Sequence, residues 1–139
     1  MLDIIKTIRD VGSRIFGLRE KLAQAKREER DRAAKYFSDL AELIEDVAAQ
    51  LRNRVYPGGS CAQMEQQAKL MPKTLKGILP DADLVAYRDK LLSVHAVEGL
   101  FDQLGALDDP ARLAELKQLD EAAGYFRAVA AHLRVAAKG

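Results

Sequence analysis

The sequence has little of several features that mark particular classes of protein. Its one cysteine, Cys61, can form no disulfide within the chain, and no N-terminal stretch combines a basic region, an apolar core and a small-residue cleavage site. The longest apolar runs are far shorter than the ~20 residues that a membrane-spanning helix needs. Together these shortages predict a soluble, cytoplasmic protein.

An excess of charge of one sign is also missing. Twenty-two basic and twenty-one acidic side chains give a formal net charge of +1. Nucleic-acid-binding domains generally carry a clear basic excess, because their basic side chains displace counterions from phosphates. We therefore expect no nucleic acid among the partners of this chain.

What the chain does have is enough length and apolar surface for one core. It has 139 residues, of which 48% are hydrophobic and 31% are charged, values typical of a folded protein. Apolar residues recur at helical spacing, and no segment shows the alternation of a strand. The sequence predicts one all-α domain over residues 1–139, an antiparallel helical bundle of about five helices with a long N-terminal helical hairpin.

Two apolar stripes with helical spacing occupy the N-terminal third. The first comprises Ile4, Ile8, Val11, Ile15, Leu18 and Leu22, and the second comprises Ala33, Phe37, Leu40, Ile44, Val47 and Leu51. The stripes are in phase, so one continuous helix over residues 2–55 is an alternative. Such a rod would be ~80 Å long, far more than a compact chain of this size allows. We therefore predict a turn within residues 23–32 and a hairpin.

Turn and capping residues mark the next helix. The run Tyr56-Pro57-Gly58-Gly59 should end the hairpin, because proline restricts the residue before it and glycine accepts positive φ. Ser60 and Gln63 match a capping box, which predicts a helix beginning at Ser60. The residues that it should bury are Met64, Ala68 and Met71. Pro72 and the turn at 77–80 should end this element.

Two further helices are predicted in the C-terminal half. Asp81 is the expected N-cap of one long helix, and Asp108-Asp109-Pro110 matches an N-cap followed by proline at the first helical position. The apolar stripe of the first is Leu84, Tyr87, Leu91, Val94, Val97, Phe101 and Leu104. The predicted buried face of the second is Leu113, Leu116, Leu119, Ala123, Phe126, Ala130 and Leu133.

Residue types that carry out chemistry are few and scattered. His95 and Glu98 could share a metal, but di-iron bundles use two Glu-x-x-His motifs in the opposite order. His132 stands alone, and Cys61 lies where a helix N-terminus could lower its thiol pKa without a histidine nearby in sequence. A small enzyme would require His95, Glu98 and Cys61 to meet in a cleft. We predict no catalytic, cofactor-binding or metal site, and no enzyme.

The two helices of the predicted hairpin have opposite charge biases. Basic residues prevail over 6–32, whereas 35–51 has only Lys35 against four acidic residues. Packed together, the helices would form a hairpin joined by weak, exposed ion pairs. Alternatively, the first helix could lie on an anionic membrane surface or in the groove of a partner. The candidate interaction residues are Ile4, Ile5, Ile8, Ile15 and Phe16, with Lys6, Arg9 and Arg14 opposing them.

Three segments resemble parts of some bacterial all-helical modules. The segment at 56–65, YPGGSCAQME, is similar to their turn-plus-helix region, and MLDIIK at 1–6 and EAAGYFR at 121–127 also look similar. These modules precede NACHT-type or TIR-type signalling domains in multidomain proteins. The resemblance implies an adaptor or effector-associated role in bacterial signalling or defence, and it assigns no site residues.

The leading hypothesis from the sequence is therefore a non-enzymatic protein-interaction module that could self-associate. Long amphipathic stripes and the lack of convergent acids, bases, nucleophiles or metal ligands support it. The alternative is a membrane-active helical bundle that acts through its first helix.

Overall fold

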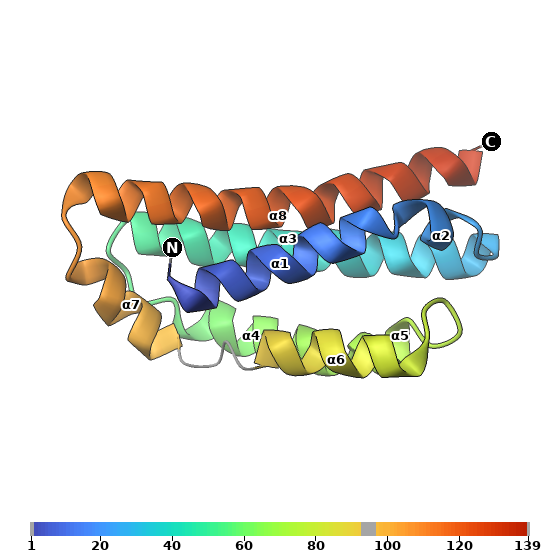
Figure 1. Ribbon diagram of the computed structural model, residues 1–139, viewed down its shortest axis with the longest axis horizontal. Helices are drawn as coiled ribbons and strands as arrows, with labels where there is room; N and C mark the ends of the chain where they lie inside the picture. The colour runs from blue at the N-terminus through green and yellow to red at the C-terminus, as the bar shows by residue number, and fades with distance from the viewer. Residues whose placement is uncertain (1, 93–96, 139) are drawn as a thin grey trace.

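Helices supply the regular secondary structure in the described part of this computed structural model, residues 2–92 and 97–138 (Figure 1). They are α1 (Asp3–Gly17), α2 (Arg19–Ala23), α3 (Arg27–Arg52), α4 (Gly58–Lys69), α5 (Met71–Thr74), α6 (Asp81–Leu92), α7 (Val97–Gly105) and α8 (Asp109–Lys138). The only β pairing in these residues is an isolated bridge between Lys76 and Leu79. The all-α prediction is confirmed, but the count of about five helices is wrong.

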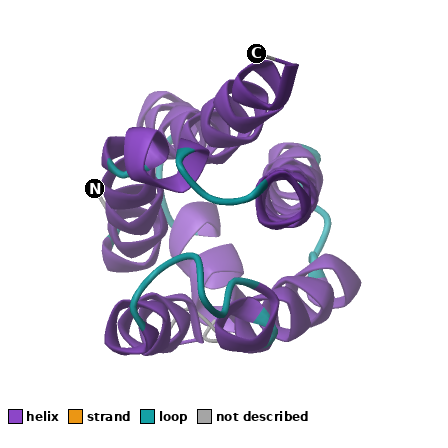
Figure 2. Ribbon diagram, turned by 90° about the vertical axis from the view of Figure 1, so that its right-hand side faces the viewer, coloured by secondary structure: helices purple, strands orange, loops and turns teal. Residues whose placement is uncertain are grey.

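The long helices, together with α2, form one layer, and α4 to α7 form a second (Figures 1 and 2). In the first layer α1 and α8 run in the same direction and α3 runs opposite to both (Figure 1). α8 packs along α3 and along α1, so the C-terminal helix joins the two N-terminal ones. In the second layer α4, α5 and α6 lie side by side, and α7 leads back to the start of α8.

The core lies mainly where α1 and α3 meet α8. The stripe predicted for α3 is buried throughout, from Ala33 to Leu51. Phe37 of α3 stacks on Phe126 of α8 with ring centroids 6.1 Å apart. Gly12 of α1 also packs on α8, where an added Cβ would lie 3.2 Å from the Cβ of Tyr125 and 3.3 Å from the carbonyl oxygen of Ala122. The absence of a side chain at Gly12 therefore allows this close approach.

The N-terminal segment bends where the sequence predicts, although its ion pairs are made elsewhere. α2 ends at Ala23 and α3 begins at Arg27, so the turn falls within residues 23–32 and the continuous rod is wrong. A further break follows Gly17. The ion pairs joining α1 and α3 to α8 are Arg9–Glu121, Arg127–Glu45 and Arg52–Asp120. The predicted charge pairing within the hairpin is replaced by pairing to α8, because α8 packs along both helices.

The predicted start of α4 is wrong by two residues. α4 begins at Gly58 after Pro57, with no side-chain cap. The hydroxyl oxygen of Ser60 instead accepts a hydrogen bond of 2.6 Å from Nε2 of Gln50. This bond joins α4 to α3, so the hydroxyl serves a tertiary contact in place of the capping box with Gln63.

The single helix predicted from residue 81 is also wrong, because the structure has two helices that lie at an angle to each other (Figure 1). Leu84 and Leu91 of α6 are buried beside α1, α4 and α5, whereas Leu100 and Leu104 of α7 are buried where α7 meets α4 and α8. One straight helix could not reach both places. The predicted stripe residue Val94 lies outside the described residues.

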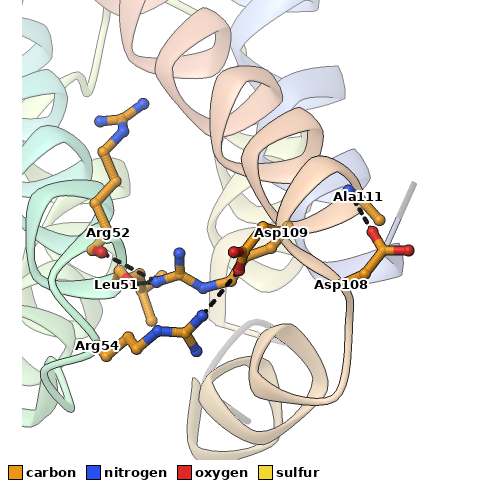
Figure 3. A network of polar contacts seen from close by, with 7 residues as sticks. Leu51, Arg52, Arg54, Asp108, Asp109 and Ala111 are labelled. Carbon is orange, nitrogen blue, oxygen red and sulfur yellow. Dashed lines mark hydrogen bonds and ion pairs between the residues drawn. The ribbon is translucent and has the colours of Figure 1, made fainter.

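The predicted start of α8 is wrong by one residue, because α8 begins at Asp109 and Pro110 is its second residue. Asp108 is the N-cap, and its Oδ1 accepts a 2.9 Å hydrogen bond from the backbone N–H of Ala111 (Figure 3). The predicted buried face of α8 is correct except at its first member. Leu113 is 54% exposed, and Arg112 is buried in its place. Arg112 is buried because it lies beside the C-terminus of α3, whose last backbone carbonyls need a hydrogen-bond donor.

Candidate functional site

Three of the five apolar candidate interaction residues of α1 lie in the core. Ile5, Ile8 and Ile15 are at most 2% exposed, and Ile4 is half-buried. Phe16 is half-buried, with its ring centroid 5.7 Å from that of Tyr125 on α8. The structure leaves Lys6 and Arg14 exposed, while Arg9 pairs with Glu121 at 3.1 Å. These side chains therefore form no single open surface.

The two described residues considered for chemistry, His132 and Cys61, lie on different helices, α8 and α4. His132 of α8 has its Nε2 3.3 Å from Oε1 of Glu20 on α2. His95 and the side chain of Glu98 lie outside the described residues. Among the residues that are described, no group of three or more histidine, cysteine, aspartate or glutamate side chains could hold a metal ion.

The thiol of Cys61 has a raised pKa, whereas an activated thiol has a lowered one. It is half-buried in the first turns of α4, and burial raises its pKa to about 11. The loss of hydration on burial disfavours the thiolate and outweighs any effect of the helix N-terminus. The suggested lowering of the pKa of this thiol is therefore wrong.

We expect iodoacetamide to alkylate Cys61 slowly in the native protein. Raising the thiol pKa from 9.0 to about 11 lowers the thiolate fraction at pH 8 about 100-fold, and the rate should fall accordingly. The rate should keep rising up to pH 11. Mass spectrometry of the time course would measure it, with the urea-unfolded chain as control. Equal rates for folded and unfolded chains would contradict this expectation.

The structure directs attention to a cavity that the sequence did not indicate. It has a volume of about 260 Å³ and lies where α3 ends, α7 passes and α8 begins. Its lining residues, which we call the arginine pocket, are Leu51, Arg54, Phe101, Asp102, Leu104, Gly105 and Arg112. Both cationic groups and apolar walls therefore face one small space.

Arg112 is the buried charge of this pocket, at 5% exposure. Its Nη2 donates hydrogen bonds to the carbonyl of Leu51 and to the carbonyl of Arg52 at 3.2 Å (Figure 3). Those carbonyls lie at the C-terminus of α3, where the helix dipole favours a cation. Among the described side chains, those of residues 2–92 and 99–136, no carboxylate forms an ion pair with Arg112. Its Nε and Nη1 carry further N–H donors.

Arg54 occupies a backbone position that normally favours glycine. Its φ is +58°, the left-handed region, just after the C-terminus of α3. The N–H of Val55 bonds to the carbonyl of Gln50 at 2.8 Å, and the N–H of Arg54 bonds to that of Leu51 at 3.2 Å. This is the Schellman pattern, in which glycine is usual because a Cβ is strained.

The side chain of Arg54 reaches across to α8. Its Nη2 lies 3.1 Å from Oδ1 of Asp109 (Figure 3). Because both partners are more than half exposed, the ion pair adds little stability. It does hold the guanidinium at the edge of the pocket. Backbone strain at an arginine that lines a cavity is a pattern associated with functional sites.

Exposed apolar side chains adjoin the arginine pocket. Val55 and Tyr56, at 50% and 46% exposure, follow Arg54 directly, and the Tyr56 ring meets that of Phe101 edge-on at 5.6 Å. Leu113, 54% exposed, lies one turn after Asp109 on the same face of α8. We call Val55, Tyr56 and Leu113 the apolar rim.

Sequence reasoning missed this site for identifiable reasons. Arg112 follows a proline-containing first turn, where an exposed arginine is the ordinary expectation. The one local indication was at Arg54, because α3 ends there without the glycine that usually follows a helix.

Comparison with known proteins assigns neither a family nor a function to this chain. A scan against protein-family models found no match, and neither did searches of curated proteins and of solved structures. In the described part of the chain, no helix combines the length and apolar character of a membrane span.

Proposed function

We propose that this chain is a protein-interaction module that binds a partner segment carrying one carboxylate beside apolar side chains. The segment would place its carboxylate in the arginine pocket and its apolar side chains on the apolar rim. The observation that carries the proposal is Arg112, a buried cation that lines a cavity without a carboxylate partner in the described residues. Buried charges are usually paired, so this arrangement favours an anionic ligand.

The charges of the pocket set how many acidic groups it would accept. Arg54 and Arg112 line it together with one acid, Asp102. A single carboxylate would gain hydrogen bonds from guanidinium groups in a partly dehydrated site. A second carboxylate would lie close to Asp102 and be repelled by it.

The apolar rim favours a protein partner over a small molecule. Its side chains lie outside the cavity, so a ligand that only filled about 260 Å³ would leave them in water. Tyrosine and arginine are also among the residues most enriched at positions that dominate the binding energy of interfaces. The adaptor or effector-associated role in bacterial signalling or defence that the sequence resemblance implies belongs to the same proposal.

Membrane action by α1 receives no comparable support. Its apolar residues Ile5, Ile8 and Ile15 pack in the core, so α1 would have to leave α8 before it could enter lipid. The cost of exposing that surface to water opposes such a release.

A random heptapeptide display library would test the proposed function without a known partner. Selected peptides should share one acidic residue next to apolar residues. By fluorescence polarisation, Arg54→Gly and Leu113→Glu should each weaken binding at least about tenfold. Val135→Glu, at a side chain that is 71% exposed near the far end of α8, serves as the matched control and should leave binding unchanged. Selected peptides without an acidic residue, or binding indifferent to Arg54→Gly, would refute the proposal.

The same Arg54→Gly variant should be more stable than the natural chain. Glycine relieves the strain of the left-handed backbone, and the lost ion pair with Asp109 is exposed, so unfolding should cost about 0.5–1 kcal/mol more. Urea denaturation followed by circular dichroism would measure this. A variant that gains stability while losing peptide binding would show that binding was not lost through unfolding. A destabilised variant would contradict the account of the turn.

A further inference from the structure

A groove runs between α3 and α4, and none of its lining residues belongs to the arginine pocket. Three adjoining cavities, of about 210, 250 and 420 Å³, share lining residues and so form one continuous depression. We call it the α3–α4 groove. Its lining residues are Arg32, Lys35, Tyr36, Asp39, Glu42, Leu43, Asp46, Ala62, Gln63, Glu65, Gln66, Gln67, Leu70 and Thr74.

Specific contacts fix the shape of the groove. The Tyr36 hydroxyl donates a hydrogen bond to the carbonyl of Gln67, and Nε2 of Gln67 donates one to the carbonyl of Tyr36 at 3.2 Å. This reciprocal pair ties α4 to α3. Two leucines then lie in the groove, Leu43, which is half-buried, and Leu70, which is 47% exposed.

The charges along α3 are arranged symmetrically about the middle of the groove. Arg32 and Lys35 lie toward the N-terminus of α3, and Glu42 and Asp46 lie toward its C-terminus. The pair Lys35 and Glu42 and the pair Arg32 and Asp46 are centred on nearly the same point, close to Asp39. Asp39 is itself neutralised by Lys35, whose Nζ lies 2.9 Å from its Oδ2. Leu70 lies toward the Arg32 end of the groove, because the hydrogen bonds between Tyr36 and Gln67 and between Arg32 and Thr74 flank it.

We propose that the α3–α4 groove binds a second copy of this chain, with the two α3 helices antiparallel about a two-fold axis near Asp39. A two-fold contact uses the same patch on both copies, which must therefore be complementary to itself. The axis places Lys35 opposite Glu42 of the partner copy and Arg32 opposite Asp46 of the partner copy. It also lays the C-terminal half of the partner copy's α3 over Leu70, which removes this exposed side chain from water.

Other occupants fit the charges less well. A uniformly basic segment would meet Arg32 and Lys35 at one end of the groove, and a uniformly acidic one would meet Glu42 and Asp46 at the other. The whole groove is matched only by a surface with acidic side chains opposite Arg32 and Lys35 and basic side chains opposite Glu42 and Asp46. A second copy related by a two-fold axis supplies charges in that order. This self-association goes beyond the proposed partner binding, and uses different residues.

The expected result in analytical ultracentrifugation is a monomer–dimer equilibrium between ~1 µM and ~1 mM. Leu70→Glu should abolish the dimer. Lys35→Glu and Glu42→Lys should each weaken it at least about tenfold, because each places like charges opposite one another. An equimolar mixture of these two variants should form a heterodimer of native affinity, since every Glu then faces a Lys. Val135→Glu is the control and should dimerise normally.

Each result decides the proposal. A natural chain that stays monomeric at ~1 mM would overturn it, as would a dimer insensitive to Leu70→Glu. Charge variants that fail singly and also fail when mixed would place the interface elsewhere and overturn it too. The substituted side chains are exposed, and circular dichroism would confirm that each variant folds. Failure here would leave peptide binding at the arginine pocket intact, because that pocket shares none of these residues.

Discussion

Replacement of Phe126 by alanine is expected to lower the free energy of unfolding by about 3–5 kcal/mol, the largest effect of a single truncation that we anticipate. The Phe126 side chain is fully buried and stacks on Phe37 across the contact of α8 with α3. Its ring also lies against α1, because Cε2 would be 3.3 Å from a Cβ added at Gly12. Truncation therefore opens a cavity at the point where all three long helices meet.

Urea denaturation followed by circular dichroism at 222 nm would measure this loss. Leu113→Ala is the matched control, because it removes a large apolar side chain from the same helix at a position that is 54% exposed. We expect that variant to stay within about 0.5 kcal/mol of the natural chain. Similar losses for both variants would contradict the central position assigned to α8.

Replacement of Gly12 by leucine is expected to cost about 3 kcal/mol or more, even though leucine favours a helix more than glycine does. An added Cβ alone would lie 3.2 Å from the Cβ of Tyr125 and 3.3 Å from the backbone carbonyl of Ala122. The remaining carbons of leucine would have to push α1 away from α8. Since α8 also packs on α3, the displacement would disturb much of the core.

Gly17→Leu is the control for this second experiment. It lies at the end of the same helix, and a Cβ added there would meet nothing within 4 Å. Helix propensity should then dominate, and we expect a gain of up to about 1 kcal/mol. Thermal unfolding of the two variants should therefore move in opposite directions. If Gly12→Leu also gained stability, α1 would not be packed on α8 in the way described.

Local sequence was a reliable guide where burial is decided by spacing along one helix. The stripe from Ala33 to Leu51 depends on neighbours within a few residues, and its prediction is confirmed. The start of α8 also depends on local residues, and it was predicted to within one residue. The break between α6 and α7 could not be found in this way, because a regular stripe continues across it. The requirement to turn back toward α8 comes from the arrangement of distant helices.

The candidate site was even harder to predict from local sequence than the break between α6 and α7. The sequence offered α1 as the interaction surface because its stripe is apolar on one face and basic on others, yet such a face is as suitable for a core as for a partner. The pocket brings together Arg54 and Arg112, which are far apart in sequence and belong to no motif. Its polar contacts come from the end of one helix meeting the start of another.

The sequence by itself therefore determined that this chain forms helices, which faces of α1 and α3 are apolar, and that a turn separates them. These features follow from residue spacing, capping and chain length. Only the tertiary structure decided that α8 packs on both N-terminal helices, that Arg112 is buried while Leu113 is exposed, and that Arg54 takes a left-handed backbone. Those outcomes depend on which helix ends and faces meet in space, and the spacing of residues along one helix carries no information about that.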